Sequence, residues 1–306
     1  MGAWGQVPAA GRGGFAALRQ PSARPRFSRF RWKDLRRAWY HLAGATVAIL
    51  VAIVAASTPA WAGAWTQEEG HGQVLLQGYG AASSSEFGPS SDLYASRPYD
   101  KVEVTLSFEY GATDWLTLLV APQYLSVNLG EPFPSSYSGP GYTDAGARVR
   151  LWRDEAWVVS AQVVGRFSGT GNSQSAAAVG YEDAELDLRL LAGYAFTLFG
   201  KAAFLDLQAA QRMRFGPPPD EVHVDLTLGV RVAERWQLLM QSFNVISEGA
   251  GEGPYFGDSY AYYKVQLGAL YDWNAAMTVG FSVVSTVYAR NAPQENGVTL
   301  TAAYRF

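Results

Sequence analysis

The chain has 306 residues, of which 24 are Lys or Arg, 27 are Asp or Glu and none is Cys, and its formal net charge is −3. The absence of cysteine excludes disulfide cross-links and thiolate metal sites. The acidic balance argues against a nucleic-acid-binding protein, which needs a basic face.

The first 62 residues are predicted to be a secretory signal peptide with an over-long basic region. Residues 1–40 carry nine Lys or Arg against one acid, Asp34, and an apolar run follows at 42–56. The segment ends in Ala60-Trp61-Ala62, a small-x-small cleavage site. The apolar run is short for a membrane-spanning helix, which needs about 20 residues. We therefore expect cleavage after Ala62; a retained anchor or an amphipathic helix is the alternative.

The remaining residues, 63–306, are predicted to form one all-β unit. Within it, 101–110 shows the pattern that later stretches repeat, and such alternation sends two sets of side chains to opposite faces of a strand. In an outer-membrane barrel the apolar set faces lipid and the polar set faces the lumen. The polar set is Lys101, Glu103, Thr105, Ser107 and Glu109, and the apolar set is Val102, Val104, Leu106, Phe108 and Tyr110.

Short and long connections alternate between the predicted strands. Bacterial barrels have short periplasmic turns and longer extracellular loops, so the pattern predicts an antiparallel, up-and-down transmembrane barrel of about 12 strands. An even number of strands places both termini in the periplasm; ten or fourteen strands are the alternatives. The strands are predicted at 72–80, 100–111, 115–127, 142–152, 156–168, 181–194, 201–215, 221–232, 236–246, 259–271, 276–289 and 297–306.

Aromatic residues recur at the short turns. Amphipathic rings settle at a membrane–water boundary, so these residues are predicted to form the periplasmic aromatic girdle. Hydrophobic contacts in a soluble core are the alternative. The girdle candidates are Trp115, Trp157, Phe199, Trp236 and Trp273.

The last predicted strand alternates up to the terminal residue, with Tyr304 and Phe306 in its apolar row. This ending resembles that of bacterial outer-membrane proteins, whose assembly machinery reads the terminal strand. Tyr304 and Phe306 are therefore the predicted assembly signal.

Two short stretches carry a family resemblance. They are Gly63-Ala64-Trp65-Thr66-Gln67 with Gly70-His71-Gly72-Gln73, and Glu109-Tyr110-Gly111-Ala112-Thr113-Asp114-Trp115. They resemble a poorly characterised group of proteobacterial outer-membrane barrels, akin to the channel proteins linked to the meta-pathway of phenol degradation. The resemblance implies a barrel and the passage of small organic molecules, and it carries over no functional residue.

Charged residues of both signs occupy the predicted lumen face. They are interpreted either as a lining that selects solutes or as a cross-strand ion-pair lattice that braces a narrow lumen, and the two are compatible. A barrel of this size lies between small filled barrels and wide porins, so a narrow or partly plugged pore is expected. The lumen candidates are Arg148, Arg150, Arg166, Glu185, Asp187, Arg189, Asp206, Arg212, Arg214, His223, Asp225 and Arg231.

An enzymatic function has little support in the sequence. Residues 63–306 contain two histidines, His71 and His223. His223 with Asp220 or Glu221 could form an acid–histidine site, but a lumen histidine among carboxylates is the simpler interpretation. No catalytic residue, cofactor or metal site is predicted. The acids of the predicted loops are expected to be solvated: Glu86, Asp92, Glu131, Glu182, Asp183, Glu248, Glu252, Asp258 and Glu295.

The predicted function is that of an outer-membrane channel or facilitator in a Gram-negative bacterium, for passive uptake of a small organic or aromatic solute. The predicted partners are outer-membrane lipid and lipopolysaccharide, the barrel assembly machinery and the solute. Nucleic acid is excluded as a partner. The alternative is a structural or surface-interaction barrel that acts through its extracellular loops.

Overall fold

The computed structural model describes residues 63–171, 173 and 175–306. The predicted signal peptide lies outside these residues, so its cleavage stays a prediction. No helix in the described part of the chain is long and apolar enough to cross a membrane.

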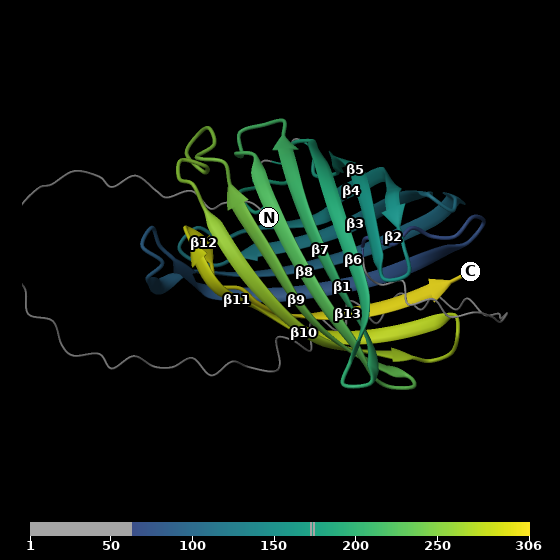
Figure 1. Ribbon diagram of the computed structural model, residues 1–306. Coiled ribbons are helices and arrows are strands. Elements are labelled where there is room, and N and C mark those ends of the chain that lie inside the picture. The colour runs from purple at the N-terminus through teal and green to yellow at the C-terminus, as the bar shows by residue number, and fades with distance from the viewer. Residues whose placement is uncertain (1–62, 172, 174) are drawn as a thin grey trace, which may run out of the picture. The chain divides into compact units, whose positions relative to one another are not determined.

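Twelve long strands of the described chain close into one antiparallel barrel (Figure 1). Each strand pairs with its neighbour in the chain, and β1 pairs with both β2 and β13, which closes the sheet. The two-residue strand β12 pairs only with the C-terminal end of β1, at Glu86 and Phe87. The strands are β1 (Gly72–Phe87), β2 (Leu93–Thr113), β3 (Leu116–Leu129), β4 (Ser135–Arg153), β5 (Trp157–Ser168), β6 (Glu185–Leu198), β7 (Lys201–Arg214), β8 (Glu221–Ala233), β9 (Trp236–Ser247), β10 (Ala261–Asp272), β11 (Met277–Arg290), β12 (Ala292–Pro293) and β13 (Asn296–Arg305).

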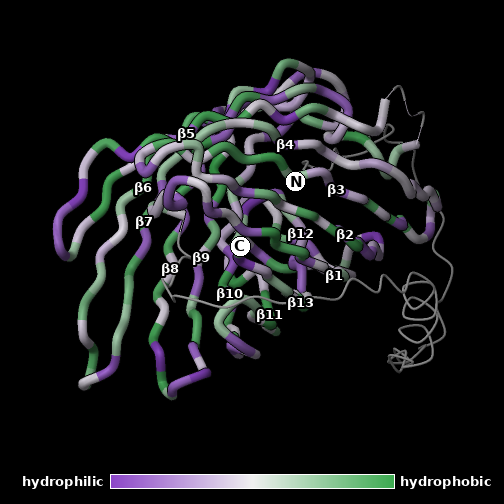
Figure 2. Tube along the Cα trace, turned by 90° about the vertical axis from the view of Figure 1, so that its right-hand side faces the viewer, coloured by the Kyte–Doolittle hydropathy of each residue, from purple (hydrophilic) through white to green (hydrophobic). Residues whose placement is uncertain are grey.

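The alternation of side chains determines the two faces of this sheet. On β7, Leu207 is 46% exposed while its neighbour Asp206 is 1% exposed. Figure 2 shows hydrophobic and hydrophilic residues interleaved along the strands. The barrel therefore presents an apolar outer surface and encloses a polar interior, which is the arrangement of a transmembrane barrel. The predicted fold class and strand count are confirmed.

Two of the expected loops are largely strand. The segments 81–99 and 128–141 were expected to be loops, but β1 runs to Phe87, β2 begins at Leu93 and β4 begins at Ser135. These extensions are rich in Ser, Gly and Pro and lack a clear apolar alternation. Backbone pairing such as Asn128 with Ser136 continues there without it, because ladder hydrogen bonds require no apolar side chain.

Five short turns join β2 to β3, β4 to β5, β6 to β7, β8 to β9 and β10 to β11, in agreement with the predicted alternation of short and long connections, and their residues explain them. Between β6 and β7 the chain reverses at Phe199 and Gly200, both with positive φ (49° and 75°), which defines the two-residue turn that matches strand twist. In two other turns a side-chain oxygen, of Asp154 or Asn274, accepts backbone N–H groups of the residues that follow, as Asx turns do.

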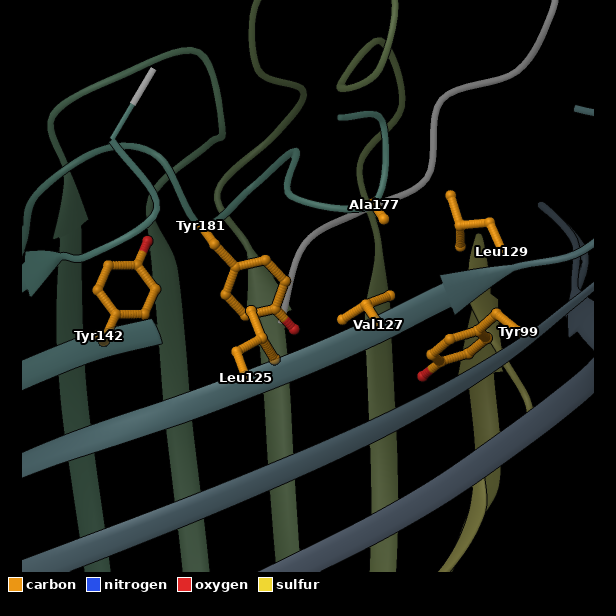
Figure 3. Packing of buried hydrophobic residues seen from close by; sticks show 7 residues of the cluster. All are labelled: Tyr99, Leu125, Val127, Leu129, Tyr142, Ala177 and Tyr181. Atoms are coloured by element: carbon orange, nitrogen blue, oxygen red, sulfur yellow. The ribbon is translucent and has the colours of Figure 1, made fainter. Parts of the chain in front are cut away.

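The long loop between β5 and β6, residues 169–184, packs against inward-facing side chains through its described residues, 169–171, 173 and 175–184. Ala177 and Tyr181 from this loop contact a buried cluster on the inner face of β2, β3 and β4 (Figure 3). The Tyr142 hydroxyl donates to the backbone oxygens of Gly180 and Asp183. Loop 169–184 therefore folds into the extracellular end of the barrel. The cluster consists of Tyr99, Leu125, Val127, Leu129, Tyr142, Ala177 and Tyr181.

Candidate functional site

The predicted lumen residues lie together on the inner face of five consecutive strands, β4 to β8. None of their side chains is exposed. A neutral polar row continues from β8 to β13: Gln241 donates to Thr227 at 3.2 Å, Gln266 donates to Gln241 at 3.0 Å and Thr299 donates to Gln266 at 3.4 Å. Charged side chains also face inward on other strands, with Lys101 on β2 and Lys264 on β10 among them, so the predicted residues form one of two charged regions of the lumen.

Eight of the twelve candidates form a continuous ion-pair lattice with Asp144 and Glu221: Arg166, Glu185, Asp187, Arg189, Arg212, Arg214, His223 and Asp225. Arg148 and Arg231 form separate pairs, with Glu109 and Asp272, and Arg150 and Asp206 form none with the described residues. Arg166 lies 2.7 Å from Glu185 and 3.0 Å from Asp144. Nearer the periplasmic end, Arg189 lies 2.7 Å from Asp225. Arg212 lies 3.1 Å from Asp187 and links this pair to the pairs around Glu185. Opposite charges on facing strands attract, and such buried pairs hold only when both partners are present. The geometry favours the interpretation that these residues brace the barrel; a role in solute selection stays a prediction.

Glu221 lies at the centre of the part of the lattice nearest the extracellular end. Its side chain is 1% exposed and accepts hydrogen bonds from Tyr260 and Arg214. His223 lies with its Nε2 atom 2.8 Å from Glu221, whereas Asp220 accepts the backbone N–H of Arg214 instead. The histidine is thus placed among carboxylates, as the simpler interpretation expects, and in the described residues its hydrogen-bond partner is Glu221.

A segment that the sequence left unassigned, residues 63–69, crosses the lumen near the periplasmic end. The backbone N–H of Ala64 donates to Asp206 on β7 at 2.9 Å, and the Ala64 carbonyl accepts from Ser160 on β5 at 2.6 Å. At its other end, the Gln67 N–H donates to Thr117 on β3 at 2.8 Å. We call residues 63–69 the lumen segment.

Close packing holds the lumen segment on both sides. The ring of Trp65 lies edge-on to Phe204 with their centroids 6.0 Å apart. A Cβ atom at Gly193 would lie 2.4 Å from the Trp65 ring, and one at Gly111 would lie 2.0 Å from the carbonyl oxygen of Glu68. Gly111 and Trp65 belong to the two stretches that carry the family resemblance, so these motifs specify the seat of the segment. The resemblance of these two stretches to the barrel family was the one feature of the sequence that pointed to this segment.

Two cavities lie on opposite sides of the lumen segment. The periplasmic cavity, about 620 Å³, is lined by Trp65, Gln67 and residues of the short turns. The central cavity, about 220 Å³, is lined by Gly63, the first residue of the segment, and by four arginines: Arg148, Arg166, Arg189 and Arg212. The lumen segment therefore divides these two spaces, in agreement with the expected narrow or partly plugged pore.

One loop acid departs from the expectation that all of them are solvated. Glu295, just before β13, is 5% exposed and turns into the lumen. It pairs with Lys264, lies 3.8 Å from Lys101 and accepts a hydrogen bond from Tyr79. The expectation was wrong here because β12 pairs with β1 and directs the next residues inward.

The predicted girdle residues are exposed on the outer surface beside the short turns, with exposed fractions from 44% for Trp157 to 96% for Phe199. The last strand closes the barrel: Tyr304 pairs with Val74 of β1, and the backbone N–H of Phe306 donates to the Gly72 carbonyl. These positions suit the two predictions, and the membrane boundary and the assembly signal stay predictions. In the described residues no group of three or more His, Asp or Glu could hold a metal ion.

Comparison with solved structures shows the fold. The COG4313 outer membrane channel from Pseudomonas putida F1 matches over 82% of this chain and 100% of its own, with 17% sequence identity and a TM-score of 0.64. The NanC porin matches over 75% of this chain and 98% of its own, with 9% identity and a TM-score of 0.44. The translocator domain of the autotransporter NalP from Neisseria meningitidis matches over 78% and 90%, with 8% identity and a TM-score of 0.45.

No family model matches the sequence, and no curated protein matches it. The chain has the fold of an outer-membrane β-barrel, as its strand pattern and its family resemblance predict. The link to phenol degradation is not shown.

Proposed function

We propose that the chain is a channel of the bacterial outer membrane through which a small organic solute passes down its concentration gradient, and that the lumen segment and loop 169–184 restrict this passage. The observation that carries the proposal is the closed barrel with an apolar outer surface and a polar, partly hollow interior. The outer surface would contact lipid and lipopolysaccharide, and the terminal strand would engage the assembly machinery.

The surfaces that line the lumen support a solute with both apolar and polar parts. Near the extracellular end, two apolar clusters face inward, one around Leu125 and Tyr181 and the other around Tyr260 and Tyr262. Below them lie the arginines of the central cavity. Aromatic rings favour flat organic groups, and guanidinium groups favour carboxylates. A small aromatic acid combines the two kinds of contact.

Single-channel recording of the protein purified from outer membranes into planar bilayers tests the proposal. We expect small, stable conductance steps, because the lumen segment occupies the pore, and larger steps from a variant in which residues 64–68 are deleted. Liposome swelling with benzoate and with a neutral sugar of similar size then measures the preference of the pore. If neither protein conducts, although heat-modifiable migration in gels shows that both are folded, the result would contradict a channel.

The second candidate is a barrel that acts through its extracellular loops without transport. The dense lattice on β4 to β8 and the two segments folded into the lumen favour it, since both fill the interior. The deletion variant distinguishes the two candidates. A barrel that stays closed without residues 64–68 is a structural one, whereas a barrel that conducts without them is a channel with a removable obstruction.

A further inference from the structure

Asp206 is a buried carboxylate whose partners are all neutral. Its side chain is 1% exposed, accepts the Ala64 N–H at 2.9 Å and accepts the Gln208 amide at 2.6 Å. Among residues 63–171, 173 and 175–306, no Arg, Lys or His side chain forms an ion pair with it. The other carboxylates of the wall differ: Asp187 and Asp225 each pair with Arg189.

Arg148 and Arg189 attract the Asp206 carboxylate only from beyond ion-pair distance. A buried charge without a cation in direct contact is costly, so its position calls for one. The nearest backbone position that could supply one is Gly63. Its nitrogen is one residue from the Ala64 nitrogen that already donates to Asp206, and successive backbone nitrogens are roughly 3 Å apart. Gly63 also packs against Gln208, since a Cβ there would lie 2.2 Å from the Gln208 amide nitrogen. A positive charge at the Gly63 nitrogen would therefore lie beside the Asp206 carboxylate.

We propose that hydrolysis of the peptide bond between Ala62 and Gly63 creates an α-ammonium group at Gly63, and that this group forms a buried ion pair with Asp206 that fastens the lumen segment across the barrel. A leader peptidase of small-x-small specificity supplies the reaction. Water adds across the bond, leaving a carboxylate on Ala62 and the protonated amine on Gly63. The proposal uses the same lumen segment as the proposed function, but it requires no solute to pass.

The new charge also bears on the central cavity. Gly63 lines this cavity with four arginines and two acids, Asp144 and Asp187. The α-ammonium adds one more positive charge, so processing makes the cavity more favourable for an anionic group. Before hydrolysis Gly63 has an uncharged peptide nitrogen, so the cavity wall gains this charge only when the leader is removed.

The first experiment determines the N-terminus. The full chain is produced with its own leader in a Gram-negative host and purified from the outer membrane, and its intact mass is measured. We expect the mass of residues 63–306 with a free amine. A chain that begins elsewhere, or a blocked amine, overturns the proposal.

The second experiment removes each partner of the ion pair. The variant Asp206→Asn neutralises the acid, and Asp225→Asn is the control because Asp225 lies on the same wall, pairs with Arg189 and does not contact the lumen segment. The variant Gly63→Gln removes the ammonium, since an N-terminal Gln cyclises with loss of ammonia. Its control is Gly63→Asn, which keeps a free amine, and intact mass verifies both termini.

Hydrogen exchange of the peptide covering residues 64–71 is the measurement. We expect exchange about tenfold faster or more in Asp206→Asn and in cyclised Gly63→Gln, because breaking a buried pair raises local opening. Asp225→Asn should stay near the wild-type rate. Gly63→Asn carries the same Cβ beside Gln208 as Gly63→Gln, so cyclised Gly63→Gln should exchange faster than Gly63→Asn, and Asp206→Asn should add nothing to the cyclised variant. Equal exchange in all variants overturns the ion pair. Because exchange is measured without conductance, a silent barrel with a protected segment contradicts the proposed channel and leaves this inference standing.

Discussion

Arg148 on β4 donates a hydrogen bond of 3.0 Å to the backbone carbonyl of Trp65 and thereby joins the barrel wall to the segment that crosses it. A second guanidinium nitrogen of Arg148 lies 3.0 Å from Glu109 on β2. Glu109 in turn accepts from the Gln67 side chain at 2.8 Å. One arginine thus ties two strands and the lumen segment into a single unit near the periplasmic end of the lumen.

Replacing this arginine should loosen the lumen segment. In Arg148→Met the Trp65 carbonyl loses its donor and Glu109 loses its counter-charge, so the lumen segment should leave its seat more often. We expect larger or more frequent conductance steps in planar bilayers. The control is Arg231→Met, because Arg231 pairs with Asp272 and forms no hydrogen bond with the segment. Identical recordings from the two variants would show that Arg148 does not hold the segment.

A clash at Gly111 should displace the lumen segment without removing any charge. A Cβ in Gly111→Ala would lie 2.0 Å from the Glu68 carbonyl oxygen, and backbone cannot yield as a flexible side chain can. We expect faster liposome swelling than with the wild-type protein. Gly80→Ala is the control, because nothing lies within 4 Å of a Cβ at that position. Equal swelling by the two alanine variants would contradict the observed seat of the segment.

The barrel can be predicted from the sequence because the side chains that face lipid must be apolar on every strand. Outward residues such as Leu207 must be apolar, while inward ones such as Asp206 are free to be polar, and the resulting alternation is visible in single strands. Even the more apolar β5 obeys it in the structure, with Val158 buried inside and Val163 exposed outside. The strand count and the short turns follow from that single constraint.

The interior contacts could not be predicted in the same way. The lumen segment and loop 169–184 contact the wall through backbone atoms and scattered side chains, which leave no period in the sequence. The seat of Trp65 depends on Gly193 and Phe204, residues about 130 or more positions further along the chain. The inward turn of Glu295 likewise depends on Lys264 and Tyr79. Such contacts become visible only once the barrel has closed.

The lattice should stabilise the barrel most at Glu185. This carboxylate lies 2.7 Å from Arg166 and 2.8 Å from Arg214, and its side chain is 2% exposed. In Glu185→Gln both arginines lose a buried counter-charge, which should lower the free energy of unfolding by about 3–5 kcal/mol. Urea unfolding of the protein in lipid vesicles, followed by tryptophan fluorescence, measures the change.

Asp144→Asn provides the comparison for this prediction. Asp144 pairs with one arginine, Arg166, and its side chain is 31% exposed. Partial hydration weakens such a pair, so the loss should be about 1 kcal/mol or less. Equal destabilisation by the two variants would show that the lattice does not act through its buried centre.

Loop 169–184 should be released from the extracellular end of the barrel by truncation of Tyr181. The ring of Tyr181 is 7% exposed and packs in the cluster with Leu125, Val127 and Tyr142 (Figure 3). Truncation to alanine leaves a cavity under the loop and removes most of its apolar contact. Proteinase K added to intact cells should therefore cut Tyr181→Ala within the loop at a concentration that spares the wild-type protein. The control is Tyr255→Ala, because Tyr255 is 44% exposed in the loop between β9 and β10. If both variants resist cleavage equally, the cluster does not hold the loop.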